Sequence, residues 1–133
     1  MDRKKFFEMI KDEKYARFCP TGSRYICGSG ADEDWLIQVE NLSFLTSMAV
    51  KGFTLETPEH YGLGTEFYSL RNGEINIIAT KSPAFYDKFY LATEVSKRLC
   101  LKNKPDRVAV FRAFLYNEFP VHPDETPVFE DQS

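Results

Sequence analysis

The sequence has few of the side chains that build disulfide frameworks and many metal sites. Its 133 residues include only three cysteines and two histidines. The cysteines, Cys19, Cys27 and Cys100, are odd in number and lack metal-site spacing, so we expect reduced thiols in a cytoplasmic protein. His60 and His122 are isolated in predicted loops, without the spacing of a metal pair or of a nucleophile and its base.

Long apolar runs and the common nucleotide-binding fingerprints are also missing. No run approaches the roughly 18 apolar residues that a membrane span needs, so no membrane partner is expected. Residues 28–30 read Gly-Ser-Gly but lack the rest of a P-loop or a dinucleotide-binding pattern. The net charge of −3 gives no basic surface large enough to predict duplex DNA as a partner.

The composition is that of a folded domain, with 43% hydrophobic and 15% aromatic residues. A chain of this length can bury a core without disulfides or a structural metal. We expect one domain over residues 1–120, followed by an acidic, proline-containing C-terminal tail over 121–133.

Charge is distributed unevenly along the chain. Residues 25–80 carry eight acidic side chains against only Lys51 and Arg71, and basic segments flank this stretch. The pattern suits a metal site that faces an anionic substrate, although a solvated mosaic of charges is the commoner explanation.

Hydrophobic periodicity predicts an α+β fold, with a small mixed β-sheet of about four strands packed against helices. Helix caps and breakers set most of the boundaries, because serine and proline open helices whereas glycine and proline end them. The predicted strands cover about 25–27, 32–39, 65–71 and 74–79. The predicted helices cover about 4–18, 42–51, 82–99 and 106–116.

The clearest local signal is a β-hairpin at Asn72-Gly73. Asn-Gly between alternating strands predicts a two-residue type I′ turn. This turn would place Arg71 opposite Glu74 and Ser69 opposite Asn76, with all four side chains on one polar face. That face is either the solvated side of a half-buried sheet or the wall of a site.

Two carboxylates open the second predicted strand. Because strand side chains alternate, Asp32 and Asp34 share one face, while Trp35 points to the other, which is the predicted core face. Carboxylates beside a Gly-Ser-Gly turn suit Mg²⁺ or Mn²⁺ carrying a phosphate, since these ions prefer oxygen ligands. The alternative is that both are solvated turn residues.

With these motifs in view, the chain resembles the nucleotidyltransferase superfamily with the polymerase-beta-type fold. The resemblance rests on Gly28-Ser29 after the first predicted strand and on the acidic start of the second. Segments 32–37, 69–78 and 106–111 also resemble small nucleotidyltransferase-like proteins of tailed bacteriophages. The similarity covers roughly residues 23–117.

The resemblance implies a metal-dependent enzyme that moves a nucleoside monophosphate from a nucleoside triphosphate to an acceptor hydroxyl. The implied cofactor is Mg²⁺ or Mn²⁺. The implied catalytic and metal-binding residues are Asp32, Asp34 and Glu74. The implied phosphate-binding residues are Gly28, Ser29 and Arg71. Arg71 has an alternative role as a cross-strand ion-pair partner of Glu74.

Two departures from the family pattern raise a second hypothesis. Only two residues separate Ser29 from Asp32, whereas the family has a longer stretch there, about ten residues. Asn76 faces the same way as Glu74, and in the third-acid position it would leave the site without a third carboxylate. The second hypothesis is a catalytically degenerate protein of this fold that binds a host protein or a nucleotide.

Partners and location follow from these hypotheses. The acceptor would be small, or would be held by the last two helices or by a partner chain, and RNA and a host protein are the candidate acceptors. Their basic side chains form a candidate patch, although a solvated helix face is the commoner explanation. The candidate basic patch consists of Lys97, Arg98, Lys102, Lys104 and Arg107. A phage-encoded protein would work in the host cytoplasm.

Overall fold

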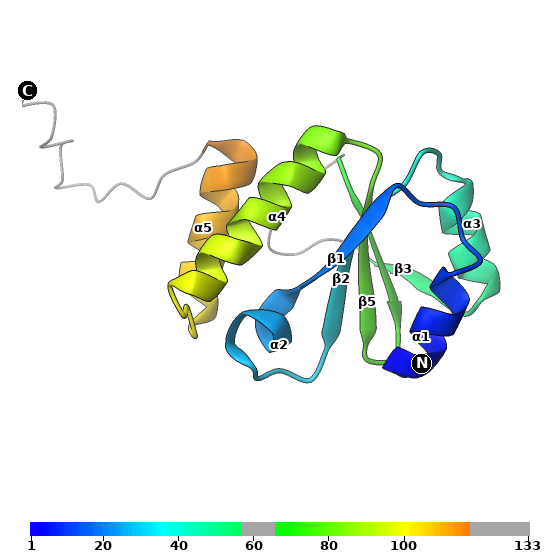
Figure 1. The fold of residues 1–133 in the computed structure, drawn as a ribbon, viewed down its shortest axis with the longest axis horizontal. Coiled ribbons are helices and arrows are strands. Elements are labelled where there is room, and N and C mark those ends of the chain that lie inside the picture. The colour runs from blue at the N-terminus through cyan, green and yellow to red at the C-terminus, as the bar shows by residue number, and fades with distance from the viewer. Residues whose placement is uncertain (57–65, 118–133) are drawn as a thin grey trace, which may run out of the picture.

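The computed structural model describes residues 1–56 and 66–117, and within them five strands form one mixed sheet between two layers of helices (Figure 1). The strand order is β1-β2-β5-β4-β3; β2 and β5 run parallel and the other neighbours antiparallel. The predicted α+β class is therefore confirmed. The strands are β1 (Arg17–Thr21), β2 (Glu33–Gln38), β3 (Thr54–Glu56), β4 (Tyr68–Asn72) and β5 (Ile75–Thr80). The helices are α1 (Arg3–Ile10), α2 (Gly22–Cys27), α3 (Ser43–Val50), α4 (Pro83–Arg98) and α5 (Lys104–Tyr116).

Both faces of the sheet are buried, which gives the domain two hydrophobic cores. On one face, α1 and α3 pack over Trp35, Ile37 and Ile77. On the other face, α2, α4 and α5 pack over Leu36 and Ile78. The prediction of a single core face for β2 is therefore wrong, because a central strand between two helix layers buries side chains in both directions.

The predicted helix over residues 4–18 is instead a shorter helix followed by the edge strand β1. Asp2 caps α1 by accepting a hydrogen bond from the Lys5 N–H at 2.8 Å, and the helix ends at Ile10. Pairing with β2 then draws Phe18 into register opposite Ile37. Pro20 fits within β1 because an edge strand needs only one side of its backbone to form hydrogen bonds.

The predicted strand at residues 25–27 is the last turn of α2. Gly28 ends this helix in the left-handed conformation, with φ of +76°, and its N–H donates to the Arg24 carbonyl at 3.0 Å. Ile26 is buried in the core beneath α4 and α5. A run of three apolar residues is too short for its periodicity to distinguish a strand from a helical turn. The burial of Ile26 in the core decided that this segment is helical.

The hairpin forms where predicted, but its turn lies one residue further along the chain. The two loop residues are Gly73 and Glu74, so Arg71 lies opposite Asn76 and not opposite Glu74. Gly73 has φ of +62° whereas Glu74 has no positive φ, so the loop is not the predicted type I′ turn. Asn72 instead ends β4. Ser69, Arg71 and Asn76 still share one face, because the pairing shifts by two residues and side chains alternate with period two. Glu74 leaves that face for the loop, and Ser69 lies opposite Ile78 instead of Asn76.

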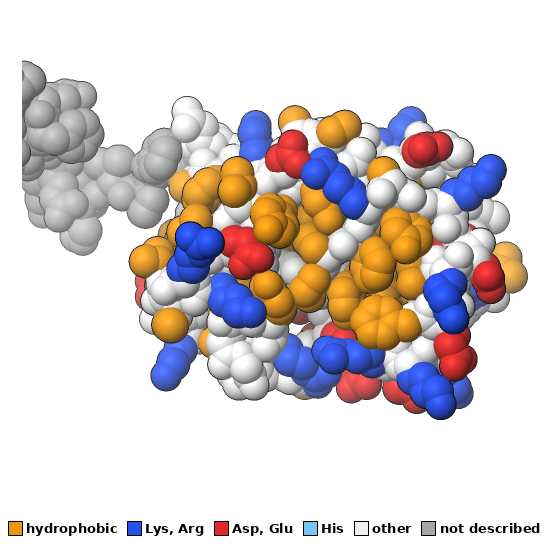
Figure 2. Space-filling model, viewed as in Figure 1, with side chains coloured by type: hydrophobic (Ala, Val, Ile, Leu, Met, Phe, Trp, Pro, Cys, Tyr) orange, Lys and Arg blue, Asp and Glu red, His pale blue; other side chains and the backbone are white. Residues whose placement is uncertain are grey.

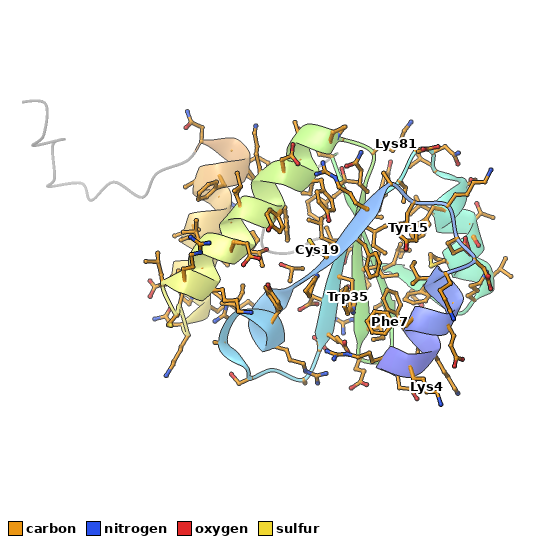
Figure 3. The ribbon with its side chains drawn as sticks, viewed as in Figure 1. Lys4, Phe7, Tyr15, Cys19, Trp35 and Lys81 are labelled. Carbon is orange, nitrogen blue, oxygen red and sulfur yellow. The ribbon has the colours of Figure 1, made fainter. Side chains whose placement is uncertain are left out.

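An aromatic cluster fixes α1 against the sheet. Its members lie around Trp35, with ring centroids 5.5 Å away for Phe6, 5.2 Å for Phe7 and 5.4 Å for Phe18. Figure 3 places Phe7, Tyr15 and Trp35 together between α1 and β1. Figure 2 shows that apolar side chains gather on this face of the molecule, over β1 and between α1 and α4.

The remaining predictions of helices and loops have different outcomes in different parts of the chain. The last two helices are confirmed, with Ser82 accepting a hydrogen bond from the Phe85 N–H at 3.1 Å at the start of α4. The predicted loop after α3 instead begins with the edge strand β3. The rest of that loop, with His60, and the predicted tail over 121–133, with His122, lie outside the described residues. Within the described ranges no helix is long and apolar enough to cross a membrane.

Phe6→Ala should lower the free energy of unfolding by about 3–5 kcal/mol, because Phe6 is fully buried and its removal leaves a cavity under Trp35. The matched change Phe7→Ala should cost only about 1 kcal/mol, since Phe7 is 36% exposed. Urea unfolding followed by the fluorescence of Trp35, the single tryptophan, measures both. Equal losses in the two variants would contradict this account of the core.

Candidate functional site

A cleft of about 450 Å³ opens on the sheet face that α2 and α5 cover. One part of its lining is polar and charged, and the other part is apolar. The polar part consists of Thr21, Ser23, Asp32, Asp34, Glu56, Ser69, Arg71, Asn76, Lys104 and Arg107. The apolar part includes Ile26, Phe67, Ile78, Phe89, Val108 and Phe111.

The sheet register places three polar residues of the cleft in one row. Asp34 on β2 lies opposite Asn76 on β5, and Asn76 lies opposite Arg71 on β4. Residues paired across strands share a face, so the row lies on the side where the cleft opens. The parallel pairing of β2 with β5 therefore brings the acidic motif and the hairpin together.

Asp34 is held by the neighbouring strand. The Asn76 side-chain amide donates from Nδ2 to Asp34 Oδ1 at 3.0 Å, while Asn76 Oδ1 accepts from the Ser69 hydroxyl at 3.3 Å. Burial raises the pKa of the Asp34 carboxyl above its ordinary value, and the hydrogen bond from Asn76 acts in the opposite direction. The Asn76 amide thus presents a donor to Asp34, and its oxygen is turned toward β4.

Asp32 precedes β2 and is paired with an arginine. Arg71 Nη1 lies 2.9 Å from Asp32 Oδ1, and Arg71 Nε donates to Glu56 Oε1 at 2.6 Å. The ion pair with Glu74, one of the two roles left open for Arg71, is therefore replaced by pairs with Asp32 and Glu56. The shifted turn is the reason, because it moves Glu74 out of register with Arg71.

Glu74, the predicted third carboxylate, is not brought to the other two. It lies in the hairpin turn, outside the cleft lining, with Oε2 3.9 Å from Arg24 Nη2. Asn76 occupies the place beside Asp34. Within residues 1–56 and 66–117, no group of three or more His, Cys, Asp or Glu side chains is arranged to hold a metal ion.

Gly28 and Ser29, the predicted phosphate-binding pair, follow the end of α2 and do not line the cleft. A second Gly-Ser pair, Gly22 and Ser23, begins α2 and does line it. Sequence reasoning missed this pair because it placed a helix up to residue 18 and a strand at 25–27. The spacing held the signal, since eight residues separate Ser23 from Asp32, close to the family's stretch of about ten.

Gly22 allows the backbone of α2 to approach Asp34. A Cβ atom at this position would lie 1.8 Å from Asp34 Oδ2, and the residue has φ of +80°. Only glycine meets both requirements without strain, since other residues carry a Cβ and avoid this φ. The close contact sets the position of the Asp34 carboxylate against the start of α2.

Part of the basic patch predicted on the last two helices forms a wall of the cleft. Lys104 and Arg107 come from the first turn of α5 and line the cleft, and Arg107 also donates to the Leu101 carbonyl at 3.1 Å. Lys97 lies elsewhere, 3.8 Å from the centroid of the Tyr25 ring. The cleft therefore holds carboxylates paired with Arg71 and further cationic groups from α5, together with an apolar part.

Comparisons with known proteins give little further information. No protein-family model matches the chain, and no curated protein matches it. Among solved structures, the crystal structure of conserved protein GrpB from Enterococcus faecalis is similar, with a TM-score of 0.45 and 13% sequence identity over 86% of this chain and 88% of that chain. A similarity of this size carries no argument about function.

Gly22→Ala should destabilise the fold by about 1–3 kcal/mol more than Gly28→Ala does. Both glycines have a positive φ, so both variants bear the cost of a left-handed conformation, about 1–2 kcal/mol. Only the Gly22 variant adds a clash with Asp34, since nothing lies within 4 Å of a Cβ at Gly28. Urea unfolding measures the difference, and equal costs would show that Asp34 does not rest against Gly22.

Proposed function

We propose that this protein binds a nucleoside triphosphate together with a divalent cation in the cleft, and that binding, with little or no nucleotidyl transfer, is its function. The carrying observation is the pairing of Asp34 with Asn76. It joins the retained Asp-x-Asp motif to an amide, in the place where the resemblance implies a third carboxylate.

The donor set of the cleft fits one divalent cation that arrives with phosphates. Mg²⁺ usually takes one or two protein carboxylates and completes its shell with water and phosphate oxygens. Asp32 and Asp34 would supply those carboxylates from the start of β2. The set does not fit a site with three shared carboxylates, because Glu74 is outside the cleft and Asn76 turns its amide nitrogen to Asp34.

The other walls suit the remaining parts of a nucleotide. Lys104 and Arg107 provide positive charge for phosphate oxygens, and the Ser23 hydroxyl provides a further donor. The apolar part of the lining, which includes Phe67 and Phe111, offers a surface for a base. A divalent cation bound by the two aspartates would offset the charge of the phosphates. Each part of the ligand then meets side chains of complementary chemistry.

Asn76 supports binding over transfer. Transfer to a hydroxyl needs a group that accepts the hydroxyl proton, and a side-chain amide has no useful basicity at neutral pH. The Asn76 oxygen also accepts a hydrogen bond from the Ser69 hydroxyl.

The second candidate function is the metal-dependent transferase implied by the resemblance. The observation that favours it is that Asp32 and Asp34 both line one cleft. The relation to bacteriophage proteins and a cytoplasmic location remain predictions from the sequence.

Calorimetric titration with ATP, GTP, CTP and UTP in the presence of Mg²⁺ or Mn²⁺ tests the binding proposal. We expect the natural protein to bind at least one of them, and Asp34→Asn to weaken that binding about tenfold or more by removing a charged ligand of the cation. The control Asp87→Asn removes an exposed carboxylate that lies outside the cleft lining and should leave the affinity unchanged. Absence of binding by the natural protein would overturn the proposal.

Asn76→Asp tests why transfer is expected to be weak. We expect the variant to be less stable than the natural protein in EDTA, because two carboxylates then face each other, and to regain stability with Mg²⁺. Attack of water on the α-phosphorus of the bound triphosphate, which forms the nucleoside monophosphate and releases pyrophosphate, should become faster by up to the factor of about 10²–10⁴ that a general base supplies.

The control for this variant is Asn41→Asp, which retains the oxygen that accepts from the Ser43 N–H near the start of α3. This position does not line the cleft, so the change should affect neither metal-dependent stability nor pyrophosphate release. Rapid pyrophosphate release by the natural protein, equal to that of Asn76→Asp, would favour the transferase over the binding protein.

A further inference from the structure

Arg71 joins three strands of the sheet through its guanidinium group. The side chain extends from β4, with Nη1 2.9 Å from Asp32 Oδ1 at the start of β2. Its Nε donates at 2.6 Å to Glu56 Oε1 on β3. One fixed positive charge therefore stands between two carboxylates of the cleft, one of which is part of the Asp-x-Asp motif.

This arrangement places Arg71 in competition with any cation that Asp32 would bind. An arginine keeps its charge at all ordinary pH values, so Arg71 remains a cation beside Asp32. Its release requires that another cation take Asp32 and that another anion take the guanidinium. The side chains of Arg71 and Asp32 are 35% and 46% exposed, so water screens the pair and its strength is modest. An exchange of partners is therefore energetically accessible.

We infer that Arg71 is an internal counter-ion of the cleft, which holds Asp32 in the absence of nucleotide and exchanges it for a phosphate group when nucleotide and cation bind together. This inference rests on the proposed function. Phosphate oxygens accept hydrogen bonds from guanidinium groups in the geometry that a carboxylate offers, so the exchange replaces one charge-assisted contact with another.

The consequence is that cation and nucleotide bind cooperatively. A cation alone must displace Arg71 from Asp32 without providing it a new partner, so its binding is weak. A cation that arrives with a triphosphate provides that partner. Coupling of this kind is reciprocal, so each ligand raises the affinity for the other by the same factor.

A purely structural role for Arg71 makes the opposite prediction. If Arg71 only ties β2, β3 and β4 together, its removal loosens the cleft and lowers or leaves unchanged the affinity for a cation. If Arg71 competes with the cation, its removal raises that affinity. The sign of the change therefore separates the two roles.

The experiment measures the binding of MnCl₂ alone and of Mn·ATP by calorimetry, with the base replaced if another triphosphate proves to bind better. We expect Arg71→Gln to bind Mn²⁺ alone roughly three- to tenfold more tightly than the natural protein, and Mn·ATP more weakly. Arg71→Lys, which keeps the charge but loses the planar fork, should show smaller changes in the same directions. Lys88→Gln removes an exposed positive charge outside the cleft lining and should leave the affinity for Mn²⁺ alone and for Mn·ATP unchanged.

The outcomes separate this inference from the proposed function. Unchanged or weaker binding of Mn²⁺ alone by folded Arg71→Gln and Arg71→Lys overturns the inference, whereas Mn·ATP binding by the natural protein would still support the proposed function. Tighter binding of Mn²⁺ alone by Arg71→Gln, without Mn·ATP binding by any variant, supports the competition at Asp32 and overturns the proposed nucleotide site. Absence of Mn²⁺ and Mn·ATP binding in every variant overturns both. Trp35 fluorescence during urea unfolding confirms that each variant is folded.

Discussion

The parallel pairing of β2 with β5 is the constraint on which the cleft depends. It places Asp34 beside Asn76, and the hairpin then carries the row of polar residues on to Arg71. Hydrophobic cores on both faces of the sheet hold this pairing, because a slip by one residue would turn Leu36 and Ile37 to the wrong layers. The position of the Asp34 carboxylate is thus set by the burial of the apolar residues that follow it on β2.

The acidic groups of the cleft are satisfied by the chain itself. Asp34 accepts from Asn76, and Asp32 and Glu56 share Arg71. Such pairing lowers the cost of placing carboxylates close together in a partly buried site. It also means that a cationic ligand has to compete with internal partners. A protein that binds nucleotide and cation together, and responds weakly to either alone, is consistent with this balance.

The sequence predicted the long elements better than the short ones. The last two helices span several turns and begin with capping residues, so local chemistry decided them. The hairpin forms near its turn signal, but its loop is shifted by one residue. Residues 17–27 hold a five-residue strand and a six-residue helix, too short for periodicity to distinguish. Because of that error, the prediction chose Gly28-Ser29 and overlooked Gly22-Ser23, the Gly-Ser pair that lines the cleft.

The sequence by itself determined that this is a small α+β domain with an Asp-x-Asp motif on a strand and a polar hairpin face, because alternation and turn chemistry are local properties. Only the tertiary structure decided which hairpin residue meets Asp34. In the predicted strand over residues 74–79, Glu74 and Asn76 face the same way, so no local rule separates them. The choice depends on where β5 aligns against β2 and where the hairpin turn closes. Both are set by packing between segments that are more than 40 residues apart in the chain. The contact of Asn76 with Asp34, for example, spans 42 residues.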